Sequence, residues 1–292
     1  MQGVFPAIVT PFKDGGVYYE GLEKNINFLI DNGVSGIVSV GTTGESPTLT
    51  YEEHQKVIEK AVDTVNGKVK VIAGSGSNST KEAIELSQFA EDVGADAVLL
   101  ITPYYNKPTQ EGLKKHFGKI AESINIPIVL YNVPSRTAVN LEPETIKYLY
   151  EEYSNITTVK EANPNLSQVS EIVSSCDINV LSGNDELTLP IISLGGKGVI
   201  SVLANIVPKE FVEMVDYALE GKFDKAREIH CKLFNLMKLM FVETNPIPIK
   251  TAMNMLNMPA GELRLPLCEM SQENKLKLES ALIEAGLLKK KL

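Results

Sequence analysis

The stretch Ile156-Thr157-Thr158-Val159-Lys160-Glu161 decides how this chain folds and where its chemistry is expected. Its first four residues are all β-branched, which is typical of a buried strand, and the turn-forming run Asn163-Pro164-Asn165 follows closely. The strand therefore ends at Lys160. Because burial disfavours a charged ammonium, a neutral amine becomes available there, and such an amine can attack a ketone or aldehyde to form a Schiff base. The alternative is a lysine that ends a strand and extends its ammonium into the solvent.

Short β-rich runs of this kind alternate with amphipathic helical patterns from the N-terminus to about residue 220. The predicted strands are Val4–Thr10, Gly36–Val40, Val69–Ala73, Ala97–Ile101, Ile128–Asn132, Ile156–Lys160, Asn179–Ser182 and Gly198–Val202. Continuous apolar strands that alternate with helices predict a parallel sheet covered on its outer face. About eight such units favour an α/β fold of the TIM (β/α)8 barrel type. A doubly wound open sheet has the same alternation and stays open as an alternative.

The pattern changes after Glu220. Phe223–Val242 predicts one long helix, which Asn245-Pro246-Ile247-Pro248 interrupts, and two further helices are expected near Ile249–Leu256 and Ser271–Ala285. No further strand is predicted in this part. We therefore divide the chain into a catalytic barrel at residues 1–221 and a C-terminal helical region, an appendage on the barrel, at residues 222–292.

The composition excludes several classes of function. The 292 residues are 43% hydrophobic, enough for a large core, but no run approaches the ~20 apolar residues of a membrane span. The start, Met1-Gln2-Gly3-Val4-Phe5, has no basic segment that would begin a signal peptide. Cys176, Cys231 and Cys268 form no C-x-x-C pair, which predicts a cytoplasmic protein without a disulfide scaffold. The net charge of -9, with Lys289-Lys290-Lys291 as a basic run at the end, argues against nucleic acid.

Polar, glycine-bearing and aromatic segments follow several predicted strands, and the chemistry of a TIM barrel lies at the carboxyl ends of its strands. These segments are Gly41-Thr42-Thr43-Gly44-Glu45-Ser46, Thr102-Pro103-Tyr104-Tyr105-Asn106, Tyr131-Asn132-Val133-Pro134-Ser135-Arg136, Lys160 and Ser182-Gly183-Asn184-Asp185. The first of them is either a plain turn or a set of backbone N–H groups that would hold a carboxylate. Taken alone, Tyr131 fits a core tyrosine and Arg136 a surface ion pair.

Cofactor and metal motifs are not recognisable. Gly74-Ser75-Gly76 lacks the third glycine of a dinucleotide fingerprint, and no acidic residue follows on a second strand. His54, His116 and His230 lie within helical patterns at spacings that suggest no metal site. We therefore expect neither a cofactor nor a metal, which leaves an imine on Lys160 as the means of activating a substrate.

The order of these motifs resembles the dihydrodipicolinate synthase family, also called 4-hydroxy-tetrahydrodipicolinate synthase, a branch of the pyruvate-dependent class I aldolases. The resemblance covers nearly the whole chain, from Gly3 to Pro266. Its most specific stretches are Gly41-Thr42-Thr43-Gly44-Glu45, Pro103-Tyr104-Tyr105-Asn106-Lys107-Pro108, Tyr131-Asn132-Val133-Pro134-Ser135-Arg136-Thr137 and Val159-Lys160-Glu161. It implies a lyase that condenses pyruvate with L-aspartate 4-semialdehyde to give 4-hydroxy-tetrahydrodipicolinate, which leads into diaminopimelate and lysine biosynthesis.

The resemblance assigns roles residue by residue. The catalytic residues would be Lys160, which forms the Schiff base, Tyr131, which shuttles protons, Thr42, its relay partner, and Tyr105, which reaches into the neighbouring subunit's site. The substrate-binding residues would be Thr43 on the pyruvate carboxylate, Gly183 and Ile200 through their backbones, and Arg136 on the carboxylate of the semialdehyde. The role of Tyr105 requires at least a dimer, and the family is usually a dimer of dimers, so a homotetramer is expected.

Regulated members of the family bind L-lysine in a cleft at the dimer interface. The positions that correspond to this allosteric site are Ser46, Tyr51, His54, Asn78, Glu82 and Tyr104. Tyr51 stands where regulated bacterial members often carry histidine, and Pro47 where they often carry alanine, so we expect weaker inhibition. The alternative is that Asn78 and Glu82 only cap the helix that follows Gly76.

Two other functions remain open. Sugar-acid lyases such as N-acetylneuraminate lyase and the keto-deoxy sugar acid aldolases also use a lysine and a tyrosine, so Lys160 and Tyr131 do not discriminate against them. The Thr42-Thr43 pair, the Tyr104-Tyr105 pair and Arg136 favour the synthase. A non-catalytic barrel that senses keto acids is the third possibility, and the complete set of lysine, tyrosine and threonine disfavours it.

Overall fold

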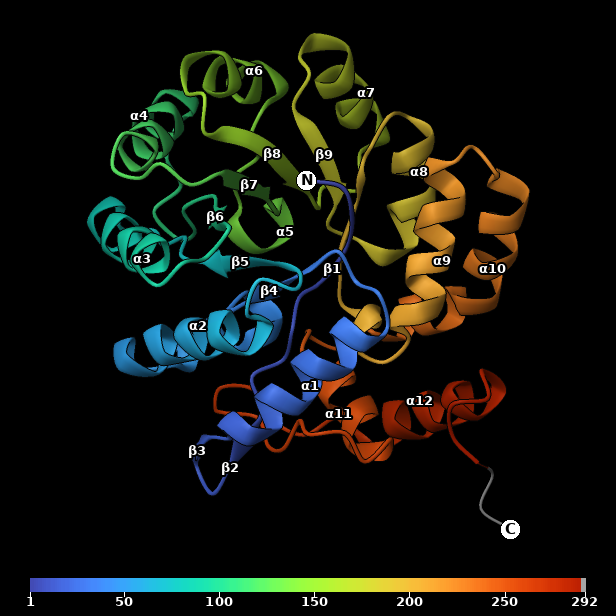
Figure 1. Cartoon of the computed structure of the whole chain (residues 1–292). Helices are drawn as coiled ribbons and strands as arrows, with labels where there is room; N and C mark the ends of the chain where they lie inside the picture. Colours follow the sequence, from blue (N-terminus) through green and yellow to red (C-terminus); the bar gives the residue numbers. More distant parts are fainter. Residues whose placement is uncertain (290–292) are drawn as a thin grey trace.

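Eight parallel strands form a ring at the centre of the molecule in the computed structural model, which describes residues 1–289 (Figure 1). In chain order they are β1 (Gly3–Pro6), β4 (Gly36–Ser39), β5 (Lys70–Gly74), β6 (Ala97–Ile101), β7 (Ile128–Asn132), β8 (Ile156–Glu161), β9 (Asn179–Ser182) and β10 (Gly198–Ser201). Lys290 and Lys291 of the basic run at the end of the chain lie outside the described residues.

The ring closes between β1 and β4. Each strand from β4 to β10 pairs with the next, and β1 pairs with β10. Just beyond β1, Ala7 bridges to Val38 of β4, and the backbone N–H of Ile8 donates to the carbonyl oxygen of Val38 (3.0 Å). The predicted barrel is therefore confirmed and the open sheet is wrong. The first strand is shorter than the predicted Val4–Thr10, because the chain leaves β10 after Pro6 to meet β4.

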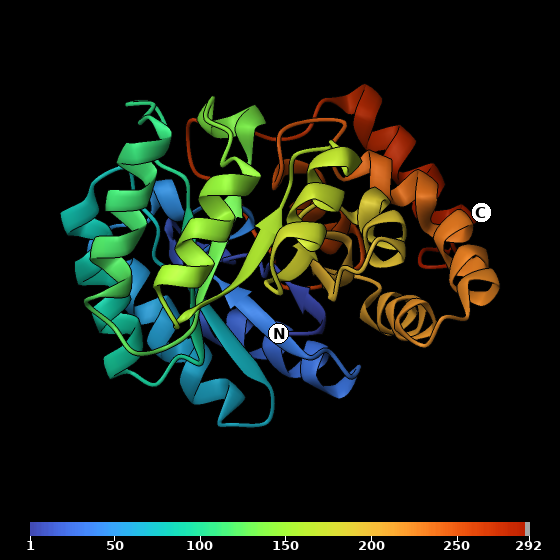
Figure 2. The same ribbon diagram turned by 90° about the horizontal axis from the view of Figure 1, so that it is seen from above.

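Helices cover the outside of the barrel (Figures 1 and 2). They are α1 (Tyr19–Asp31), α2 (Tyr51–Val65), α3 (Thr80–Asp92), α4 (Gln110–Ala121), α6 (Pro143–Glu152), α7 (Leu166–Ser175), α8 (Thr188–Ser193) and α9 (Pro208–Leu219). The loops between strands and helices contain the short helix α5 (Pro134–Thr137) and the 3-10 turns η1 (Thr42–Gly44), η2 (Ser46–Thr48), η3 (Asp185–Leu187) and η4 (Leu203–Asn205). Because β-strands alternate their faces, one set of side chains fills the interior of the barrel and the other packs against the helices.

Local sequence explains where the helices begin. Thr50 and Glu53 form a capping box at the start of α2, in which the Thr50 side chain accepts from the backbone N–H of Glu53 and the Glu53 carboxylate accepts from that of Thr50. Ser79, and not Asn78, caps α3, since its side chain accepts from the backbone N–H of Glu82. None of the helices within residues 1–289 is long and apolar enough to span a membrane.

The C-terminal region consists of α10 (Phe223–Leu239), α11 (Ile247–Met255) and α12 (Gln272–Glu284). Here α10 packs against α9, and α12 packs against both α10 and α11 on one flank of the barrel (Figures 1 and 2). Helix α10 ends at Leu239 and not at the predicted Val242. The backbone N–H groups of Phe241 and Val242 donate to carbonyl oxygens three residues earlier, which tightens the last turn. One apolar cluster joins barrel residues to these helices, so the division at residue 221 stays a prediction.

A small hairpin between β1 and α1 was not predicted from the sequence. It is formed by β2 (Phe12–Lys13) and β3 (Gly16–Val17), joined by Asp14 and Gly15, which both have positive φ. Asp-Gly is a strong signal for such a turn and was present in the sequence. Phe12 also bridges to Gly261, so the C-terminal region contributes one backbone pairing although its described residues, 222–289, form no strand.

Candidate active site

Lys160 and Tyr131 lie side by side at the carboxyl ends of neighbouring strands. They are register partners on β8 and β7, and both are buried, with Lys160 only 7% exposed. The Nζ atom of Lys160 lies 4.1 Å from the centre of the Tyr131 ring. Within residues 1–289 no carboxylate forms an ion pair with Lys160. The lysine is therefore buried next to an aromatic face without a counter-ion, as the sequence predicted for its position on the strand.

A cavity of about 150 Å³ opens in front of Lys160. Among the residues that line it are six of the eight predicted catalytic and substrate-binding residues: Thr42, Thr43, Tyr131, Arg136, Lys160 and Gly183. At Gly183 a Cβ atom would lie 2.6 Å from the Cβ of Ala162, so a larger residue would not fit without a shift of the backbone. The barrel therefore brings hydroxyl groups, an amine and a guanidinium to one small space.

Two of the predicted residues do not line this cavity. Ile200 lies inside the barrel, 1% exposed, and Val202 lines the cavity in its place. Tyr105 is almost fully exposed, with 92% of its surface accessible and a φ of 73°. Within the described part of the chain, no hydrogen bond joins Tyr131 to Thr42 or to Tyr105. The proton relay is therefore not assembled in a single copy of the chain.

Buried ionic contacts hold the loop that carries Thr42 and Thr43. Glu45 ends this loop in the left-handed conformation, with a φ of 54° and 2% exposure. Its carboxylate accepts from Lys250 Nζ (2.7 Å) and from the backbone N–H of Arg264 (3.1 Å). Burial lowers the pKa of Lys250, and the neighbouring Glu45 carboxylate opposes this shift. Sequence reasoning missed Lys250, although a lysine within the apolar run Ile247–Met253 indicates a buried charge that needs a partner.

Asn245, which lines the cavity, is a second functional residue that sequence reasoning missed. It lies in the turn between α10 and α11 and is 5% exposed. Its Nδ2 atom donates to Thr43 Oγ1 (3.0 Å), and its carbonyl oxygen accepts from the Arg136 guanidinium (3.2 Å). From the sequence, this segment is predicted only to interrupt a helix.

Two buried carboxyl groups support the strand ends around Lys160. Glu161 accepts hydrogen bonds from the side chains of Asn132 and Gln168, and burial raises its pKa while these bonds oppose the shift. Asp185 accepts from the backbone N–H groups of Val202 (3.1 Å) and Leu203 (2.8 Å), and burial raises its pKa as well. Neither group lines the cavity, so both fix the backbone that surrounds it. Residues 1–289 contain no group of three His, Cys, Asp or Glu side chains placed to hold a metal ion.

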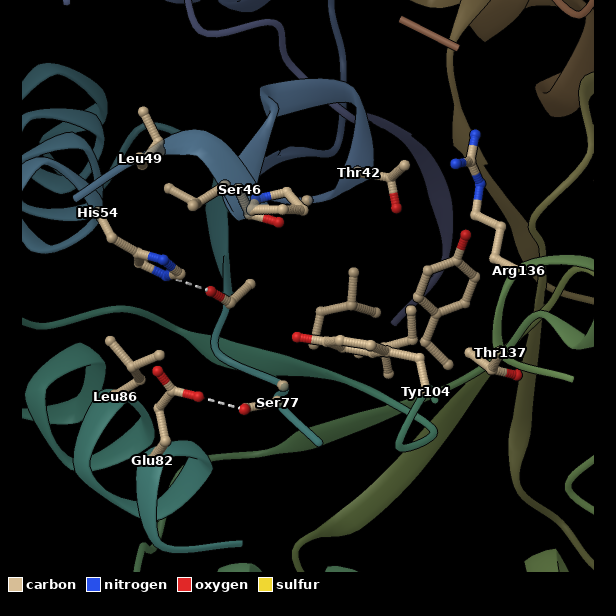
Figure 3. A pocket seen from close by; sticks show the side chains of 18 of the residues that line it. Thr42, Ser46, Leu49, His54, Ser77, Glu82, Leu86, Tyr104, Arg136 and Thr137 are labelled. Carbon is tan, nitrogen blue, oxygen red and sulfur yellow. Dashed lines mark hydrogen bonds between the residues drawn. The ribbon is translucent and has the colours of Figure 1, made fainter. Parts of the chain in front are cut away.

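A second cavity, of about 470 Å³, extends from the site along α2 and α3 (Figure 3). Thr42, Tyr131 and Arg136 line one part of it. The predicted allosteric residues that line it are Ser46, Tyr51, His54, Glu82 and Tyr104. Two of these side chains are engaged: His54 Nε2 contacts the carbonyl oxygen of Gly74 (2.7 Å), and the Glu82 carboxylate accepts from the Ser77 hydroxyl (Figure 3).

Asn78 does not line this second cavity. Its Nδ2 atom donates to the carbonyl oxygen of Tyr104 (3.1 Å), and its own carbonyl oxygen accepts from Asn106 Nδ2 (2.8 Å). Asn78 therefore shapes the loop that presents Tyr104 and Tyr105, and it reaches the cavity only through that loop.

A (β/α)8 barrel with a buried lysine at the end of its sixth strand, facing a small polar cavity, has the architecture of the lysine-dependent aldolases. The chain belongs to the dihydrodipicolinate synthetase family, whose model matches residues 1–285.

Individual relatives agree with this assignment. The 4-hydroxy-tetrahydrodipicolinate synthase of Methanococcus aeolicus is 81% identical over 288 residues, which cover 99% of this chain and 100% of that protein. A crystal structure of a dihydrodipicolinate synthase superposes with a TM-score of 0.98 at 77% identity and covers 99% of this chain and 100% of its own. The Cyanidioschyzon merolae enzyme, solved with lysine bound, has a TM-score of 0.96 at 42% identity, over 98% of this chain and 99% of its own.

These relatives confirm the predicted family, the barrel fold and the lyase activity. They do not favour the alternative aldolases, N-acetylneuraminate lyase among them.

Proposed function

We propose that this chain condenses pyruvate with L-aspartate 4-semialdehyde through a Schiff base on Lys160. The observation that carries the proposal is the position of this amine, which is buried at the end of β8, faces the Tyr131 ring and opens onto a cavity lined by Thr42 and Thr43. The size of that cavity, about 150 Å³, suits a small keto acid.

The reaction needs an electron sink and a route for protons. Once deprotonated, the amine of Lys160 attacks the ketone carbon of pyruvate, and uptake of one proton, delivered through Tyr131, with loss of water leaves a protonated imine. The imine withdraws electrons, so a methyl proton can leave and the resulting enamine can attack the aldehyde carbon of the semialdehyde. Tyr131 is the neighbouring group that would give and take these protons, and because a phenol hydroxyl is a weak acid it needs hydroxyl partners to do so at neutral pH. Thr42 and a partner's tyrosine would supply them.

Substrate carboxylates would be held on two sides of the cavity. Thr43 and the backbone around Gly183 line the same cavity as Lys160 and suit the carboxylate of pyruvate. Ile200, for which the resemblance implies a backbone contact with pyruvate, does not line this cavity, so its contact stays a prediction. Arg136 is exposed at the rim, where its planar fork suits the carboxylate of the semialdehyde.

Reductive trapping tests the Schiff base directly. The protein is incubated with pyruvate and borohydride, digested and mapped by mass spectrometry, and a reduced pyruvyl adduct is expected on the peptide that contains Lys160. Lys250, the other buried lysine among residues 1–289, is the internal control and should stay unmodified. An adduct on another lysine, or no adduct, would contradict the proposal. Condensation assays beside sialic acid and keto-deoxygluconate cleavage separate the synthase from the alternative aldolases.

We also propose that the chain works as a homotetramer, a dimer of dimers, in which Tyr105 completes the site of the neighbouring subunit. Its 92% exposure supports this role, since a tyrosine in the tight loop after β6 is otherwise left in water. Tyr105→Phe and Lys160→Ala subunits, each nearly inactive alone, are mixed under conditions that exchange subunits. Activity should partly return if Tyr105 acts across the interface. If no activity returns although subunit exchange is proven, Tyr105 acts in the site of its own subunit.

The cavity of about 470 Å³ supports a regulatory site for free L-lysine. It collects five of the six predicted allosteric residues, and the Cyanidioschyzon merolae enzyme was solved with lysine bound. The Glu82 carboxylate would pair with an ammonium group of the ligand. Lysine titrations at fixed pyruvate compare wild type with Glu82→Ala and with Glu59→Ala, which removes an exposed carboxylate of α2 outside the cavity. Only Glu82→Ala should lose inhibition, and wild type that is unaffected by millimolar lysine would exclude this site.

We assign the enzyme to the cytoplasm. All three cysteines are free, and Cys231 and Cys268 are exposed, which suits a reducing compartment. Cell fractionation followed by the condensation assay checks this assignment.

A further inference from the structure

Asn245 connects the C-terminal region to both sides of the cavity. Its side-chain Nδ2 donates to Thr43 Oγ1 (3.0 Å), and its backbone carbonyl oxygen accepts from the Arg136 guanidinium (3.2 Å). The residue is 5% exposed and lines the same cavity as Lys160. A single residue that lies 202 positions from Thr43 thus contacts both side chains that would hold substrate carboxylates.

The direction of the Asn245–Thr43 hydrogen bond determines what Thr43 can do. A threonine hydroxyl has one proton to donate and two lone pairs that accept. The amide N–H of Asn245 occupies an accepting position, and none of residues 1–289 accepts a hydrogen bond from Thr43 Oγ1. The Thr43 proton is therefore available to an anion in the cavity. If the amide were reversed, its oxygen would take that proton, and Thr43 would be unable to donate to a carboxylate.

We propose that Asn245 is a positioning residue that keeps the Thr43 hydroxyl as a hydrogen-bond donor to the carboxylate of an α-keto acid at Lys160. The inference rests on the proposed function, because it takes the anion beside Thr43 to be the carboxylate of pyruvate. The Oδ1 atom of Asn245 is buried and has no hydrogen-bond partner among the described residues, so the bond from Nδ2 to Thr43 is the one hydrogen bond that the amide group makes there.

The two contacts of Asn245 come from different parts of the residue, so a substitution of its side chain should affect only one of them. A change of the side chain removes the contact with Thr43 but keeps the backbone carbonyl that binds Arg136. Loss of a hydrogen bond to a charged group weakens binding by about ten- to a hundredfold. The weakening should therefore appear in the KM for pyruvate and not in the KM for the semialdehyde.

Steady-state kinetics of Asn245→Ala and Asn245→Asp test this selectivity. Asn245→Ala should raise the KM for pyruvate about tenfold and leave that for the semialdehyde within about twofold. Asn245→Asp, which has nearly the same shape, should be worse, because its carboxylate accepts the Thr43 proton and repels the substrate. The matched control is Asn254→Ala, which removes two hydrogen bonds to Gly261 in the same C-terminal region and should change neither KM. Equal changes in both KM values would overturn the inference.

A double mutant asks whether Asn245 acts through Thr43. Thr43→Val removes the hydroxyl, so adding Asn245→Ala to it should raise the KM for pyruvate by less than about twofold more. Multiplicative effects of the two substitutions would show that Asn245 acts independently and would contradict the inference.

Reductive trapping separates failure of this inference from failure of the proposed function. The borohydride adduct on Lys160 is measured against the concentration of pyruvate or of hydroxyacetone, a ketone without a carboxylate. Asn245→Ala should need about tenfold more pyruvate for half-maximal adduct, with hydroxyacetone unchanged. An adduct that forms in both proteins with the same dependence on pyruvate overturns only the role of Asn245. The absence of any adduct in wild type overturns the proposed function instead.

Discussion

Two buried lysines, Lys160 and Lys250, lie in regions of opposite character. They are 7% and 1% exposed. Lys250 forms an ion pair with Glu45 (2.7 Å) and donates to the carbonyl oxygen of Thr10 (3.1 Å), so its donors are used. Lys160 faces an aromatic ring and a cavity, and no carboxylate among residues 1–289 forms an ion pair with it. Burial alone therefore does not distinguish the two lysines, and the cavity beside Lys160 and its lack of an ion pair are the features on which its proposed reactivity rests.

The first prediction concerns the lysine without a counter-ion. Lys160→Ala should lower kcat for the condensation by roughly 10⁴-fold or more, because the covalent intermediate can no longer form. Its unfolding free energy should change by no more than about 1 kcal/mol, since no ion pair is lost. The condensation assay and chemical denaturation measure the two quantities. Retained activity would break the comparison, because the reactive amine would then lie elsewhere.

The paired lysine should show the reverse behaviour. Lys250→Met leaves the Glu45 carboxylate buried without its cation and should lower the free energy of unfolding by about 3–5 kcal/mol. The double variant Lys250→Met with Glu45→Gln removes both charges and should recover a large part of that loss. Folded Lys250→Met should still form the pyruvyl adduct on Lys160. If the single and double variants were equally stable, the ion pair would not be what holds this region together.

His116 is a third buried basic group, and it can be compared with the two lysines. Its Nδ1 contacts the Thr80 hydroxyl (2.9 Å), its Nε2 has no hydrogen-bond partner among the described residues, and burial lowers its pKa to about 4. A histidine in the unfolded chain titrates near ~6.5. Between these two pKa values the unfolded state binds more protons than the folded state. The contribution of neutral His116 to the free energy of unfolding is therefore complete above the pKa of the unfolded state, and it is lost as the pH falls toward the pKa of the folded state.

This loss amounts to about 3 kcal/mol. His116→Asn keeps a polar group near Thr80 but cannot titrate, so its free energy of unfolding should fall less steeply with acid. Denaturation curves of the variant and wild type between pH 7 and pH 4 give the two slopes. Identical slopes would mean that folding does not lower the pKa of His116.

Arg136, an exposed cation at the rim, should show the smallest effect. Arg136→Lys keeps the charge but loses the planar fork that suits a carboxylate. The KM for the semialdehyde should rise about tenfold, while that for pyruvate stays within about twofold. Kinetics with each substrate varied in turn supply both values. Equal changes would indicate that Arg136 acts mainly through its contact with Asn245 and supports the cavity as a whole.

The barrel and most of the cavity were predictable because their signals are local. The β-branched run before Lys160 marks a strand, and parallel strands of a barrel present their carboxyl ends on one face, which brings Lys160 to Tyr131. The roles of Thr43 and Arg136 came from the resemblance of motifs that directly follow strands. The proposed site residues therefore lie next to strand ends that the sequence itself predicts.

Asn245 and Lys250 were not predictable in the same way. Both belong to the C-terminal region, where the apolar pattern indicates packed helices and says nothing about which loop of the barrel they meet. Their partners, Thr43 and Glu45, lie more than 200 positions earlier in the chain. Tyr105 raises a different difficulty, since the site it would serve belongs to another copy of the chain.

The ion pair between Glu45 and Lys250 also sets the order of events during protein synthesis. The two residues are 205 positions apart. At ~5–20 residues per second, a ribosome takes roughly 10–40 s to travel that distance. Throughout this interval the Glu45 carboxylate of the nascent barrel is expected to stay hydrated, because burying a charged carboxylate without its cation is costly. The loop that carries both threonines is therefore expected to become rigid only after nearly all of the polypeptide has been made.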